Sequence, residues 1–155
     1  MTLLICFSPW VRRGLSLKGG VVVVNIAANR SLLALVLVHA AASLVHFVHN
    51  ATFLADYPNM PAWLSPAGVY AVWLAQAAIG LAGVLLFLRG RPIGLALVAI
   101  YAVLGFAGLD HYVLAPLSAH TAAMNATIWL EFATGMLLLV FVAWKMRLLR
   151  ADALV

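Results

Sequence analysis

"LLALVLVHAAASLVHFVHN", residues 32–50, is an almost unbroken apolar run, and its length decides the fold of the chain. A helix that crosses a bilayer core about 30 Å thick needs roughly 20 residues of this kind. Three further runs meet the same condition, separated by prolines, glycines and basic residues: 67–88, 92–112 and 121–144. The sequence therefore predicts an all-α fold, an integral membrane four-helix bundle.

The overall composition leads to the same class of protein. Of 155 residues, 66% are hydrophobic and only 8% are charged, whereas a soluble domain carries about a quarter charged residues. The single cysteine, Cys6, has no partner for a disulfide within the chain. Cysteine-ligated zinc and iron–sulfur clusters are also excluded as devices of one chain.

The basic residues predict the orientation of the bundle. All nine Lys and Arg residues precede the first run, lie between the second and third runs, or follow the fourth. By the positive-inside rule, both termini are expected in the cytoplasm, and the net charge of +5 reflects topology, not nucleic-acid binding. We expect a cytoplasmic or interfacial segment at 1–31, the helical domain at 32–144 and a basic tail at 145–155. The expected location is the bacterial plasma (inner) membrane.

Two of the predicted helices carry polar stripes. At about 100° per residue, His46 and Asn50 fall on one face of the first helix, and His49 borders that face. In the fourth helix, Thr127 and Glu131 share a stripe that begins at His120. Glu131 lies roughly 15 Å into its helix, near the bilayer middle. There an acid that faced lipid would cost several kcal/mol, so Glu131 is expected to face the bundle interior.

Polar residues of all four helices are expected to converge on one outward-facing pocket. The residues in question are His46, His49, Asn50, Gln76, Asp110, His111, His120 and Glu131, and Asp56 follows in the first outer loop. Two histidines three residues apart on one helix can share a metal ion, and a carboxylate can complete its ligand set.

A metal-dependent site is the leading functional prediction. The predicted ligands are His46, His49, His111, His120 and Glu131, with Glu131 also as the catalytic acid or base. Asn50, Asp56, Gln76 and Asp110 are expected in supporting positions. The ion would be zinc, copper or iron, and it would serve a lipid-modifying or redox enzyme acting on a lipid-like small molecule. Neither HExxH nor ExxH occurs in the chain.

Three alternatives stay open at this point. Two histidines on facing helices can ligate haem b. A metal-free pair of Glu131 and a histidine can move protons, either for catalysis or for a proton-coupled carrier. The chain can also be a non-catalytic subunit whose polar groups bind other membrane subunits. In architecture alone, a four-helix membrane protein with intramembrane acids resembles the emopamil-binding and sigma-2 receptor group, and no residue role follows from that.

Overall fold

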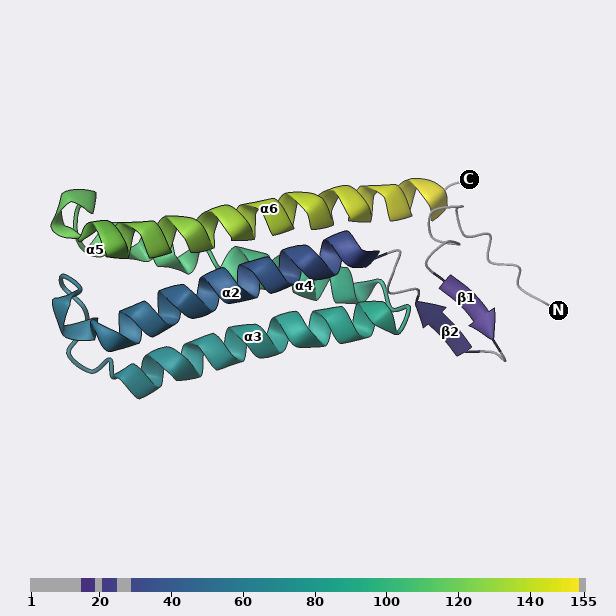
Figure 1. The fold of residues 1–155 in the computed structure, drawn as a ribbon. Helices are drawn as coiled ribbons and strands as arrows, with labels where there is room; N and C mark the ends of the chain where they lie inside the picture. The colour runs from purple at the N-terminus through teal and green to yellow at the C-terminus, as the bar shows by residue number, and fades with distance from the viewer. Residues whose placement is uncertain (1–14, 19–20, 25–28, 154–155) are drawn as a thin grey trace.

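The computed structural model describes residues 15–18, 21–24 and 29–153 of the chain. Four long helices lie side by side along one common direction (Figure 1). They are α2 (Arg30–Thr52), α3 (Pro66–Leu88), α4 (Ile93–Leu104) and α6 (Ala122–Ala153). The shorter elements are β1 (Leu15–Lys18), β2 (Val21–Val24), η2 (Leu54–Asp56), η3 (Ala107–Asp110), α5 (His111–Leu114) and η4 (Leu117–Ala119).

Four spans in this structure are long and apolar enough to cross a membrane, the third running from Ile93 to Leu114. Large apolar side chains point away from the bundle, such as Leu37, Leu81 and Leu137, which are 69%, 60% and 61% exposed. Water would penalise that much exposed apolar surface, whereas lipid does not. The prediction of an all-α integral membrane four-helix bundle is confirmed.

The two ends of the bundle differ in charge, and we name them for it. The basic end carries Arg30, the α3–α4 turn with Arg89 and Arg91, and Arg150 near the end of α6. The histidine end carries the loops at 53–65 and 115–121, which contain no Lys or Arg. Helix α3 begins at the histidine end. Ser65 is its N-cap, and the Ser65 hydroxyl oxygen accepts a hydrogen bond of 3.2 Å from the backbone N–H of Gly68.

The third span is interrupted, where the sequence predicts one continuous helix over 92–112. Helix α4 ends at Leu104, and the backbone then tightens, with Phe106 N–H donating to the Val103 carbonyl at 2.9 Å. A Cβ at Gly105 would overlap the ring of His39 on α2. The chain thus lies close to α2 where the helix is interrupted, and η3 and α5 complete the span.

The other boundaries differ less from those predicted. Helix α6 continues past the expected end at Trp144, so most of the expected basic tail is helical as far as Ala153. Strands β1 and β2 pair antiparallel, with Leu15 opposite Val24, within the predicted N-terminal segment. Its residues 1–14, with Cys6, lie outside the described part of the chain.

Close helix packing and an apolar core fill the basic half of the bundle. Helices α3 and α4 meet at Gly83 and Gly94, where a Cβ on Gly94 would overlap the carbonyl oxygen of Gly83. The larger of the two buried apolar clusters lies beside this contact and joins α2, α4 and α6: Leu32, Leu95, Val98, Tyr101, Ala102, Leu138 and Val142. The polar residues of the spans therefore lie mainly in the other half.

Candidate functional site: a buried histidine–glutamate cluster

Polar side chains from α2, α5, α6 and both loops meet in the histidine half of the bundle. We call them the polar cluster: His46, His49, Asn50, Tyr57, His111, His120, Thr127 and Glu131. On α2, His46 and Asn50 share one face because they are one helical turn apart, and both are buried, so this face points into the bundle. Most members of the cluster are buried, and His49 is half-buried.

His46 and Glu131 form the innermost contact of the polar cluster. His46 Nε2 lies 3.8 Å from Glu131 Oε2, and the two side chains are 3% and 1% exposed. Neither carboxyl oxygen forms a hydrogen bond of standard geometry among the described residues, and the Ser43 hydroxyl lies beside the carboxyl, where it can donate to it. Gly108 packs beside the pair, where a Cβ would make an ordinary contact of 3.4 Å with Glu131 Oε2.

The hydrogen bond at His46 Nδ1 determines which ring nitrogen of His46 carries the proton. Thr127 Oγ1 donates its only hydrogen to the Met124 carbonyl at 3.0 Å and lies 3.4 Å from His46 Nδ1. His46 Nδ1–H is then the donor to Thr127, and a neutral imidazole has no hydrogen left on Nε2. A bare Nε2 therefore faces the Glu131 carboxyl, an arrangement in which one proton can lie on either group.

Thr127 also connects the inner pair to the histidine end. Its side chain lies beside the hydroxyl of Tyr57, which in turn lies 3.0 Å from His49 Nδ1. Burial raises the pKa of the Tyr57 phenol, so the group is a neutral hydroxyl that can accept one proton and donate another. The order His49, Tyr57, Thr127, His46, Glu131 is a series of neighbouring proton donors and acceptors, which we call the relay.

The other two histidines pack beside the relay. The side-chain amide of Asn50 donates to His111 Nε2 at 3.0 Å, and the His111 ring lies 4.7 Å from the Tyr57 ring between centroids. His120 contacts His111 with 6.1 Å between ring centroids, and its Nδ1 donates to the Pro116 carbonyl at 3.1 Å. The His111 ring thus packs directly on Tyr57, and His120 lies behind it, with 6.4 Å between the His120 and Tyr57 ring centroids.

Three predicted supporting residues lie apart from the polar cluster. Asp56 and Asp110 are exposed to the surroundings at the histidine end. Gln76 is buried on α3, and within the described part of the chain no hydrogen bond or ring contact joins it to the cluster. The fifth histidine, His39, is deeper and separate, with its Nδ1 3.1 Å from Thr134 Oγ1.

The geometry gives the metal prediction no support. Across the described residues, no group of three or more His, Cys, Asp or Glu side chains is arranged to hold a metal ion. His46 and Glu131 supply two ligands, while the facing nitrogens of His49 and His111 are engaged by Tyr57 and Asn50. A haem between His46 and His111 does not fit this arrangement, because the two rings touch edge to face with centroids 5.6 Å apart.

Tyr57 and Thr127 in the polar cluster, and Ser43 beside it, are absent from the predicted set of site residues, although Thr127 is on the predicted stripe of Glu131. Tyr57 stands in a proline-containing loop, and its sequence position indicates only an interfacial aromatic residue. Ser43 is three residues before His46, so helical spacing does place it on the polar stripe of α2. No family model, curated protein or solved structure matches the chain, and the interpretation of this site therefore depends on its own geometry.

Proposed function

We propose that this integral membrane protein binds a proton at Glu131 and exchanges it, through His46 and the relay, with one side of the membrane. The observation that carries the proposal is the buried pair itself, with 3.8 Å between His46 Nε2 and Glu131 Oε2 and with only the Ser43 hydroxyl beside the carboxyl as a further neighbour that can donate to it. Acids placed inside membranes commonly belong to proton pathways, because the ionised form is so unfavourable there.

Each step of the exchange conserves protons. In release, Glu131 gives its proton to His46 Nε2 while His46 Nδ1–H passes to Thr127. The Thr127 hydroxyl then turns its own hydrogen from the Met124 carbonyl to Tyr57 and gives it up, and the Tyr57 hydrogen passes to His49. Glu131 is left as a carboxylate that accepts a hydrogen bond from the new Nε2–H of His46. Uptake is the reverse, and a small movement closes the 3.8 Å gap for the transfer.

Exchange with one side only is supported by the contrast between the two halves of the bundle. Beyond Glu131, towards the basic end, lies the apolar cluster of residues such as Leu95, Val98 and Leu138, which are fully buried. With the basic end in the cytoplasm, the relay faces the outside of the cell. In a bacterium this places the site on the outer half of the plasma membrane.

The chemistry that this site serves best is acid–base catalysis on a lipid-like molecule, since proton-coupled transport would also need a route from Glu131 to the other side of the membrane. Both need a group that holds a proton in low dielectric and delivers it on demand. A bound zinc, copper or iron ion stays a separate prediction, for which His46 and Glu131 supply a pair of ligands, while no group of three or more is found among the described residues.

Infrared spectroscopy of the reconstituted protein tests the proposal directly. At neutral pH exposed aspartates are ionised, so a protonated carboxyl band should come from Glu131 alone. We expect this band in the wild type and in Asp110→Asn, and its loss in Glu131→Gln. A spectrum without the band, or with the band intact in Glu131→Gln, would contradict the proposal. Stoichiometric zinc, copper or iron that is lost in His46→Gln would favour the metal site instead.

The orientation can be checked by thiol labelling of intact cells. In a Cys6→Ser background, Ser118→Cys at the histidine end should react with a membrane-impermeant maleimide. Ala151→Cys at the basic end should react only after the cells are permeabilised. Both positions are exposed in the structure, so access to the reagent depends on the side of the membrane. The opposite labelling pattern would place the relay on the cytoplasmic side.

A further inference from the structure

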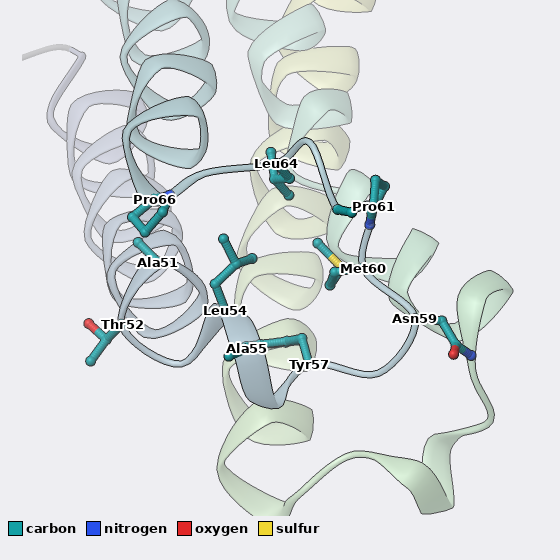
Figure 2. Close-up of a pocket in the computed structure, with 11 residues that line it drawn as sticks. Ala51, Thr52, Leu54, Ala55, Tyr57, Asn59, Met60, Pro61, Leu64 and Pro66 are labelled. Atoms are coloured by element: carbon teal, nitrogen blue, oxygen red, sulfur yellow. The ribbon is translucent and has the colours of Figure 1, made fainter.

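A groove at the histidine end lies directly beside the relay. It is bounded by the end of α2, η2, the loop at 57–65 and the start of α3, and it encloses about 590 Å³. Figure 2 shows the loop arching from Tyr57 through Met60 to Leu64, with Leu54 on the facing side. The volume falls within the range of about 300–1,000 Å³ that is usual for small-molecule sites.

The groove opens where membrane and water meet. Phe53 and Trp63 each neighbour a lining residue in the chain, and they are 45% and 81% exposed. Aromatic side chains with this exposure at the end of a membrane span lie among lipid headgroups. A molecule that enters the groove from this level therefore arrives from the lipid layer, with its apolar chain against residues such as Leu54, Met60 and Leu64.

Charge and hydrogen-bonding capacity limit the headgroup that fits. The loop at 53–65 contains no Lys or Arg, and its only charged residue is the exposed Asp56, which does not line the groove but stands in the chain between the lining residues Ala55 and Tyr57. Pro58 and Pro61 have no backbone N–H, so the loop offers more carbonyl acceptors than donors. An anionic headgroup would find neither a cation nor enough donors. A headgroup that carries N–H donors and a positive charge is complementary to this rim.

We propose that the groove binds an amphiphile of the outer leaflet whose head is a hydrogen-bond-donating amine and whose chain lies against the apolar lining. Tyr57 belongs to both the groove and the relay. The bound amine is therefore next to the group that exchanges protons with His49. The proton exchange between Tyr57 and His49 beside the bound amine depends on the proposed function, whereas the binding of the amphiphile does not.

Photolabelling of the reconstituted protein tests this site. The probes are a long-chain primary amine with a diazirine in its chain and the corresponding alkyl phosphate, each at trace level in phosphatidylcholine vesicles. We expect the amine to label the peptide that contains residues 51–66 and the phosphate to label it much less. Ala55→Phe, which fills the groove from an exposed lining position, should lower the amine labelling about tenfold. Asp56→Asn should lower it about two- to fivefold.

The controls separate the possible failures. Ala143→Phe makes the same change at an exposed position on α6 outside the groove, and labelling should not change. Equal labelling by amine and phosphate, or no loss in Ala55→Phe, would overturn the proposal, as would competition by the water-soluble butylamine. Glu131→Gln should label like the wild type. Proton exchange that fails while this labelling persists would contradict the proposed function alone.

Discussion

Replacing His46 with glutamine is expected to slow hydrogen–deuterium exchange of the Glu131 carboxyl about 100-fold or more, since positioned acid–base groups commonly contribute 10²–10⁴-fold to proton transfer. Glutamine can still donate a hydrogen bond to Thr127, but it cannot accept a proton from Glu131 and release another. The measurement is the rate at which the carboxyl infrared band shifts after transfer into deuterated buffer. The buried position of Glu131 makes other routes slow.

His120→Gln is the matched control for this experiment. His120 packs in the same cluster against His111 and Tyr112, but none of its contacts reaches His46 or Glu131. The exchange rate should stay near that of the wild type. If both substitutions slow exchange equally, the proton travels through His111 and His120, and the relay through Thr127 and Tyr57 is wrong. If neither slows it, His46 is not the partner of Glu131.

Replacing Gly94 with alanine is expected to have the largest effect on stability. The new Cβ would overlap the backbone of Phe87 and the carbonyl oxygen of Gly83, so helices α3 and α4 would have to move apart. Overpacking of a tight core contact commonly costs about 1–3 kcal/mol, and a clash with backbone falls at the upper end of that range. A denaturant titration of the protein in detergent should show a free energy of unfolding that is about 3 kcal/mol lower than that of the wild type.

Gly68→Ala is the matched control, made on the same helix as Gly83. There the new Cβ would meet Ser65 Oγ at 3.5 Å and Leu64 Cδ1 at 3.6 Å, which are ordinary contacts. Alanine in place of glycine within a helix stabilises by up to about 1 kcal/mol. The two alanine variants should therefore change stability in opposite directions. A Gly94→Ala protein as stable as the wild type would contradict the close approach of α3 and α4.

The sequence was sufficient to predict the four spans and the inward direction of Glu131. The spans follow from the length of the apolar runs, and the direction of Glu131 follows from the helical period and its depth in the span, all of which can be read from one sequence. The residues His46, Asn50, His111, His120 and Glu131 do meet in the bundle interior, as their placement on the helices predicts.

The break in the third span and the role of Tyr57 could not be predicted in this way. In the sequence, Gly105 resembles any small residue of a membrane helix. The reason that no larger side chain fits there is the ring of His39, which belongs to another helix. Tyr57 reaches the cluster because of the path of its loop, and a loop, unlike a helix, has no regular residue spacing from which a side chain's direction can be predicted. The metal prediction treated histidines on neighbouring helix faces as ligands of one ion, but hydrogen bonds to Asn50 and Tyr57 occupy two of them.

The apolar half of the bundle has a consequence for the energetics of the host membrane. Leu32, Leu95, Val98, Leu138 and Val142 are at most 1% exposed, and together they separate the polar cluster from the arginines at the other end. Among the described residues, no hydrogen bond links the polar cluster to these arginines, so an ion that entered this half would lose its hydration shell with little to replace it. We therefore expect the protein to leave the ion gradients of its membrane intact.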